Sequence, residues 1–191
     1  VVDLTRRDVR EWLYDTLSAM LRDHDIAYMK WEANRNLTDL YSSSLPPERQ
    51  GETAHRYMLG LYELLERLTS EFPEVLFEGC SGGGGRFDAG ILYYFPQIGC
   101  SDNTDPISRI GIQLGASYGY PVSAMANHVS ASPNHQTGRS APLGTRAVAA
   151  MSGSFGCELD PRSLSEAELA ECCHHIAQYR KYEKLILDGK L

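Results

Sequence analysis

The feature that most constrains this chain is a regular alternation of short apolar runs with longer segments of helical periodicity. The apolar runs predict six strands, at Val1–Leu4, Ala27–Trp31, Val75–Phe77, just before Cys100, at Tyr118–Val122 and at Phe155–Leu159. Alternating strands and helices are typical of α/β folds built on a parallel sheet. No internal repeat or low-complexity linker divides them, so we predict a single domain over residues 1–191.

Local signals mark where the helices begin. Asp105 followed by Pro106 predicts a helix start, because aspartate is a strong N-cap and proline suits the first helical position. Thr5 predicts an earlier N-cap, and Ser163 with Glu166 predicts a capping box before the last helix. The predicted buried stripes are Leu61, Leu64, Leu65 and Leu68 on one helix, and Leu169, Ile176, Leu185 and Ile186 on the last one.

Charge and composition narrow the class of protein. The formal net charge is −7, which disfavours nucleic acid as a partner, and the 42% of hydrophobic residues can supply a core. The longest apolar stretch, 91–100, is far shorter than the roughly 20 residues that span a bilayer, so we expect no membrane association. Five cysteines are an odd and sparse set without a C-x-x-C pair, and we therefore expect a reducing, cytoplasmic setting.

Polar residues gather where the predicted strands end, which is where parallel α/β folds place their reactive groups. Lys30, Glu32 and Asn34 share one face if their segment stays extended. A cation beside a carboxylate at a strand end suits an active site. A solvated, salt-bridged strand end is an equally good interpretation of these three residues alone.

A run of four glycines, 82–85, follows the third predicted strand. Glycine lets the backbone approach a ligand closely, but the run lacks the Lys-Ser/Thr pair of a phosphate-binding loop and the G-x-G-x-x-G spacing. A nucleotide-binding function is therefore disfavoured. The run predicts either a flexible loop or a surface that packs on an uncharged sugar.

The next strand leads into a second acidic segment. Asp105 is assigned to the helix cap, which leaves Asp102 as the carboxylate that can face a cleft. Two carboxylates on separate strands, without a nucleophilic Ser-His pair in a known motif, favour glycoside hydrolysis.

Histidine and cysteine pairs elsewhere do not match metal-site spacing. They are Asn127-His128, Asn134-His135-Gln136 and Cys172-Cys173-His174-His175. We expect neither a metal nor another cofactor.

Four segments carry a family resemblance: YMKWEANR (28–35), EGCSGGGGRFD (78–88), SDNTD (101–105) and HVSASPNHQ (128–136). In this order they resemble the α-galactosidases of glycoside hydrolase family 36. The resemblance implies a (β/α)8 TIM-type barrel that acts with retention on terminal α-galactosides, such as melibiose and raffinose-type oligosaccharides. A closed barrel typically needs about 250 residues. The chain is therefore interpreted as the C-terminal part of such a barrel, with about six of its eight strands, from a protein expected to form homo-oligomers.

The resemblance also assigns roles to residues. Glu32 corresponds to the nucleophile and Asp102, 70 residues later, to the general acid/base. The implied substrate-binding residues are Lys30, Trp31, Asn34, Cys80, Gly83, Arg86 and Asp88.

Two positions depart from the family pattern. Glu32 replaces an aspartate, and its extra methylene shifts the attacking oxygen by roughly 1 Å, which predicts weak turnover. Gly99 stands where the family usually has a tryptophan. An alternative interpretation is a non-catalytic carbohydrate-binding homologue or an inactive barrel fragment.

Overall fold

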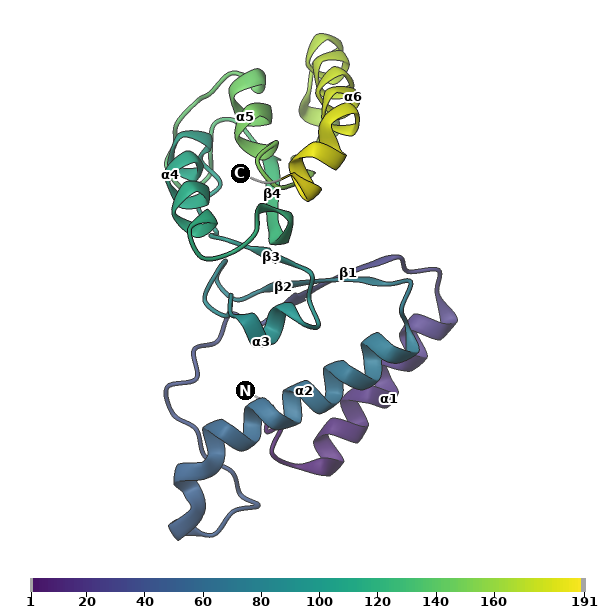
Figure 1. Cartoon of the computed structure of the whole chain (residues 1–191), viewed down its shortest axis with the longest axis vertical. Helices are drawn as coiled ribbons and strands as arrows, with labels where there is room; N and C mark the ends of the chain where they lie inside the picture. Colours follow the sequence, from purple (N-terminus) through teal and green to yellow (C-terminus); the bar gives the residue numbers. More distant parts are fainter. Residues whose placement is uncertain (1, 190–191) are drawn as a thin grey trace.

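The computed structural model describes residues 2–189 and shows five parallel strands that form a half-barrel (Figure 1). The strands follow one another across the sheet in chain order: β1 Tyr28–Glu32, β2 Leu76–Cys80, β3 Gln97–Gly99, β4 Met125–Ser130 and β5 Ser154–Glu158. Every neighbouring pair is parallel. The carboxyl ends of all five strands therefore lie at the same edge of the sheet. This is where the sequence predicts the polar clusters to lie.

Helices connect these strands, as the alternating pattern predicts. They are α1 Arg7–Asp23, α2 Thr53–Glu71, the short α3 Ala89–Leu92, α4 Pro106–Ser117, α5 Leu143–Ala150 and α6 Glu166–Asp188. In Figure 1 the two long helices α1 and α2 lie side by side, while α4, α5 and α6 gather around β4. No helix in the described part of the chain is both long and apolar enough to cross a membrane.

The prediction of six strands was wrong, since the described residues form five. Of the segment Val1–Leu4, Val1 lies outside the described residues and the rest is not a strand, because the chain turns here, with the backbone N–H of Arg6 bonded to the carbonyl of Asp3. Tyr118–Val122 is not a strand: the backbone N–H of Tyr118 bonds back to the carbonyl of Gly115 in a turn at the end of α4, and Val122 begins the 3-10 helix Val122–Ala124. The strand expected there comes later, as β4.

The helix-start predictions were confirmed at one site and wrong at two. The Asp105 side chain accepts from the backbone N–H of Ile107 and caps α4. The capping box is formed by Ser165 and Glu168, two residues later than predicted, because Pro161–Ser163 makes a separate 3-10 turn. Thr5 bonds to Asp3 and leaves the N-cap position to Arg6.

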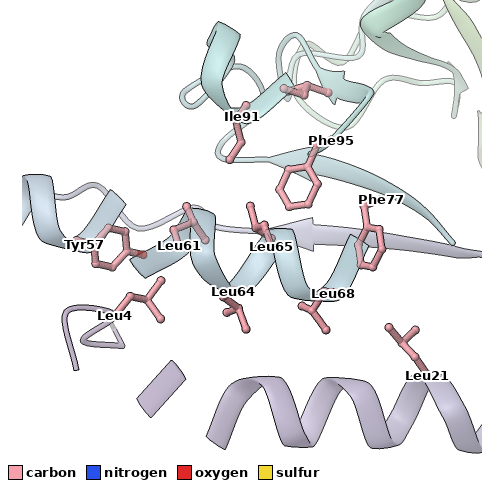
Figure 2. Packing of buried hydrophobic residues seen from close by; sticks show 11 residues of the cluster. Leu4, Leu21, Tyr57, Leu61, Leu64, Leu65, Leu68, Phe77, Ile91 and Phe95 are labelled. Atoms are coloured by element: carbon pink, nitrogen blue, oxygen red, sulfur yellow. The ribbon is translucent and has the colours of Figure 1, made fainter. Parts of the chain in front are cut away.

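The predicted leucine stripe of α2 forms the centre of the main core. All four of its leucines are almost fully buried and pack with Leu21 of α1 and with Phe77 of β2 (Figure 2). The prediction for α6 was wrong at Leu169 and Leu185, which are 38% and 70% exposed. The buried residue of that helix is Tyr179, which stacks on Phe155 and donates to the carbonyl of Gly153 at 3.0 Å.

Candidate functional site

A polar cleft of about 200 Å³ opens at the carboxyl ends of the strands. Its lining includes Lys30, Cys80, Gly83 and Asp102, which lie far apart in the sequence. They come together because Lys30 points inward from β1, Cys80 ends β2, and Asp102 begins the loop after β3. Four of the predicted site residues therefore line one cleft.

Glu32, the last residue of β1, is not among the described residues that line this cleft, and it lines a second hollow with Trp31, Asn34 and Arg86. Its Oε1 forms an ion pair with Lys30 Nζ at 3.3 Å. Partial burial raises the pKa of Glu32, but hydrogen bonds from Cys80, Lys30 and Asn34 outweigh this effect, so its net pKa lies below the ordinary value. The carboxylate is therefore ionised at neutral pH, as a nucleophile must be.

The Cys80 thiol lies close to both predicted catalytic carboxylates. Its Sγ is 4.0 Å from Asp102 Oδ1, and it is near enough to Glu32 to lower the pKa of that carboxyl. Burial and the negative charge of Glu32 raise the pKa of Cys80 to about 11, so the group is a neutral thiol at physiological pH. A thiol can contact both carboxylates without adding a third negative charge.

The glycine run is an ordered loop that fixes the position of Asp102. Gly82 and Gly83 have φ values of 56° and 76°, in the left-handed region that glycine adopts most readily. Gly83 pairs with Ser101 in an antiparallel bridge, and a Cβ at position 83 would lie 2.3 Å from the Cα of Ser101. Glycine is thus required here for close approach of two backbones.

The same loop is also joined to the end of β1. Asn34 Oδ1 accepts from the backbone N–H of Gly82 at 2.8 Å, and Ser81 Oγ donates to the carbonyl of Ala33 at 2.7 Å. Arg86 donates to the carbonyl of Arg35. The structure therefore gives Asn34 and Arg86 contacts that shape the loop.

Two predicted substrate-binding residues point elsewhere. Trp31 alternates with Lys30 and Glu32, so its side chain lies on the other face of β1, with its ring centroid 6.2 Å from that of Phe95. Asp88 accepts from the backbone N–H groups of Gly90 and Ile91 and caps α3. Neither side chain lines the cleft in the described residues.

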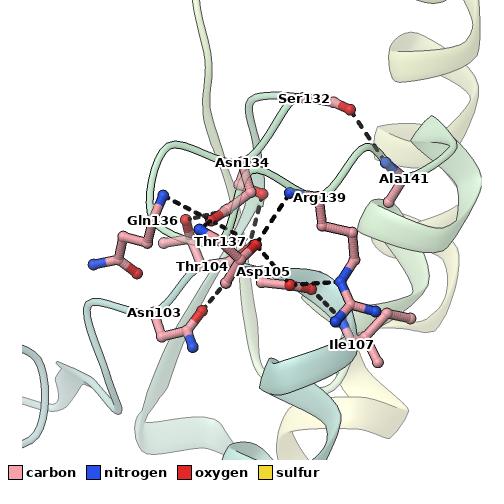
Figure 3. Close-up of polar contacts among 11 residues, drawn as sticks. Asn103, Thr104, Asp105, Ile107, Ser132, Asn134, Gln136, Thr137, Arg139 and Ala141 are labelled. Carbon is pink, nitrogen blue, oxygen red and sulfur yellow. Dashed lines mark hydrogen bonds and ion pairs between the residues drawn. The ribbon is translucent and has the colours of Figure 1, made fainter.

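The loop that carries Asp102 continues into a polar network around Asp105 (Figure 3). Asp105 is fully buried, and its Oδ2 accepts from Thr137 Oγ1 and Arg139 Nε, each at 2.8 Å. Asn134 donates to Thr104. These bonds join the loop after β3 to the loop after β4.

Sequence reasoning missed two buried charged residues that line the cleft. Arg109 donates to the carbonyls of Ser101 and Ala126 and to Asn127 Oδ1, so one side chain joins the Asp102 loop to β4. Glu78 is fully buried on β2 and lines the cleft. The sequence did contain a signal for each residue. Arg109 stands four residues after the helix cap Asp105, and Glu78 lies inside an otherwise apolar strand.

Comparisons with known proteins agree with this geometry. The Melibiase family model matches residues 1–189. The chain is 54% identical over 189 residues to alpha-galactosidase AgaA of Geobacillus stearothermophilus and 53% identical over 190 residues to alpha-galactosidase 1 of Pediococcus pentosaceus. These matches cover 99% and 100% of this chain and 26% of each relative, so the chain spans about a quarter of their length.

Solved structures give the same result. A crystal structure of a GH36 AgaA variant in complex with raffinose superposes with a TM-score of 0.95 at 53% identity, covering 98% of this chain and 26% of that one. The alpha-galactosidase from Lactobacillus brevis superposes with a TM-score of 0.95 at 44% identity, covering 98% and 25%. The resemblance to family 36 α-galactosidases is confirmed, and the chain belongs to the Melibiase family.

Proposed function

We propose that a protein containing this chain hydrolyses terminal α-galactosides of the melibiose and raffinose type, with retention of anomeric configuration. The observation that carries the proposal is that Cys80 contacts Asp102 in the cleft while Lys30, which lines the same cleft, forms an ion pair with Glu32. These contacts support a site in which carboxylates from the end of β1 and from the loop after β3 act on one substrate. Paired carboxylates flanking a glycosidic bond are the usual machinery of glycoside hydrolysis.

In the proposed reaction, Glu32 attacks the anomeric carbon while Asp102 protonates the departing glycosidic oxygen. The bond to the leaving group breaks and a glycosyl ester forms on Glu32. Asp102 then removes a proton from water, whose oxygen attacks the same carbon and releases galactose and the free carboxylate. Lys30 and the backbone around Gly83 line the cleft where the sugar ring would bind.

The named complexes of relatives support this substrate class. AgaA variants were crystallised with raffinose and with stachyose. Each of these two variants has one aspartate replaced. The two replaced aspartates lie 70 residues apart in AgaA, as do Glu32 and Asp102 in this chain. We further propose that the five strands are part of an eight-stranded barrel in a cytoplasmic, homo-oligomeric enzyme.

A chimera tests the proposal. Residues 1–189 replace the 54% identical segment of AgaA, and hydrolysis of raffinose and of an aryl α-galactoside is measured, with the anomeric form of the first product followed by proton NMR. We expect α-galactose as the first product, and near-complete loss of turnover in Glu32→Gln. A folded chimera that binds raffinose without hydrolysing it would support the non-catalytic interpretation, and β-galactose as the first product would reject retention.

A further inference from the structure

Glu78 is the most unusual side chain in the cleft. One of its carboxylate oxygens accepts two hydrogen bonds, and the other accepts none from the described residues. Its Oε2 accepts from Tyr28 Oη at 2.5 Å and from Gln97 Nε2 at 2.6 Å. These donors come from the strands on either side and clamp the group. Its Oε1 is buried and has no donor among residues 2–189. An unpaired buried carboxylate oxygen is costly, so it indicates an interaction that the resting structure does not make.

Lys30 is the cation best placed to supply that interaction. Lys30 and Glu78 are register partners on adjacent parallel strands, which lie about 4.8 Å apart, and both line the cleft. An ammonium group has three donors, and Lys30 gives one to Glu32. The Arg109 guanidinium, by contrast, is already bonded to Ser101, Ala126 and Asn127.

Charge supports the same assignment. Burial lowers the pKa of Lys30, but its interactions with Glu32, Cys80 and Glu78 outweigh burial and raise the net pKa. The other titratable or charged groups that line the cleft with Lys30 are Asp102 after β3, His128 on β4, His135 after β4, Glu158 on β5 and Arg109 on α4. Of the carboxylates in the cleft, Glu78 is the fully buried one.

We propose that Glu78 is a positioning residue that holds Lys30 in the cleft as a cation whenever Glu32 cannot pair with it. This inference rests on the proposed function, in which Glu32 becomes a neutral ester during the reaction. At that stage Lys30 loses its ion-pair partner, and the free oxygen of Glu78 accepts its N–H. Lys30 thus stays charged and directed at the bound sugar in both halves of the reaction.

Competitive labelling with acetic anhydride tests this inference without requiring turnover. Only the neutral amine reacts, so the acetylation rate of Lys30 relative to that of the exposed Lys184 reports the ionisation of Lys30. The measurement is made on the AgaA chimera and on the 191-residue chain, and data are taken from whichever protein gives native near-UV circular dichroism. Glu78→Gln keeps the shape and an acceptor for Tyr28 but removes the charge.

We expect Glu78→Gln to increase the relative rate about fivefold at fixed pH, since one nearby carboxylate charge is lost. In a Glu32→Gln background, which imitates the neutral ester, the same change should increase it by at least about tenfold. Tyr28→Phe removes one donor to Glu78 but retains its charge, and should change the rate much less than Glu78→Gln does. Equal rates with and without Glu78→Gln in the Glu32→Gln background would overturn the inference, whether or not the chimera hydrolyses galactosides.

Discussion

Replacing Gly83 by alanine should test whether the position of Asp102 determines the rate of hydrolysis, apart from the stability of the glycine loop. The new Cβ would lie 2.3 Å from Ser101 Cα and 2.6 Å from the backbone nitrogen of Asp102. Ordinary contact begins at 3.4 Å, so the backbone that carries Asp102 must retreat by about 1.1 Å. A misplacement of about 1 Å in a catalytic group can reduce the rate by about 10²-fold.

Gly82→Ala is the matched control. Both glycines have positive φ, so either alanine is disfavoured by about 1–2 kcal/mol in backbone conformation. At position 82, however, the nearest heavy atom lies 4.0 Å away, and that atom is Asp102 Oδ2. Only Gly83→Ala should displace the carboxylate.

The assay compares kcat/KM of the chimera for an aryl α-galactoside with an activated leaving group and for raffinose. We expect Gly83→Ala to lose about 10²-fold on raffinose and less on the aryl substrate, because only the poorer leaving group depends strongly on protonation by Asp102. Gly82→Ala should lose little on either substrate. Thermal unfolding should show both variants folded at the assay temperature, with Gly83→Ala the less stable because only its Cβ collides with backbone atoms. Equal activity losses for the two variants would refute the reasoning.

Three further predictions concern other residues. Glu32→Asp in the chimera should increase hydrolysis of an aryl α-galactoside by about 10²-fold, because it restores the shorter side chain, and an unchanged rate would reject Glu32 as the nucleophile. Lys30→Met removes one of the groups that lower the pKa of Glu32, so the acid limb of the kcat/KM profile should move to higher pH, whereas movement to lower pH would contradict the assignment. Leu65→Ala, at a fully buried position of α2, should reduce the free energy of unfolding by about 2–5 kcal/mol in urea denaturation, while Leu59→Ala, 54% exposed on the same helix, should change it little.

Features encoded by neighbouring residues could be predicted from the sequence. The leucine stripe of α2 follows from helical spacing, and the Asp105 cap follows from the proline beside it. The strand β4 was missed because Asn127 and His128 make its sequence polar. The Oδ1 of the buried Asn127 accepts a hydrogen bond from Arg109, which comes from another element.

The candidate site likewise combines features that the sequence predicts with features that depend on tertiary contacts. The grouping of Lys30, Cys80 and Asp102 at one end of the sheet follows from parallel strand order, and the structure confirms it. The close contact of Gly83 with Ser101 and the half-satisfied carboxylate of Glu78 depend on tertiary contacts that no local pattern encodes. The catalytic and sugar-binding roles of these residues stay predictions.

The buried guanidinium of Arg109 also joins two segments of the chain beside the cleft. Its three hydrogen bonds end on two segments distant in sequence, the Asp102 loop and β4. Releasing either segment leaves a buried cation with lost partners, so neither can detach alone without a large penalty. The two segments should therefore unfold as one cooperative unit, with the backbone amides of residues 101–105 and 125–130 exchanging with solvent at a common rate. The loop that carries Asp102 should therefore become disordered no more often than β4, the strand to which Arg109 joins it.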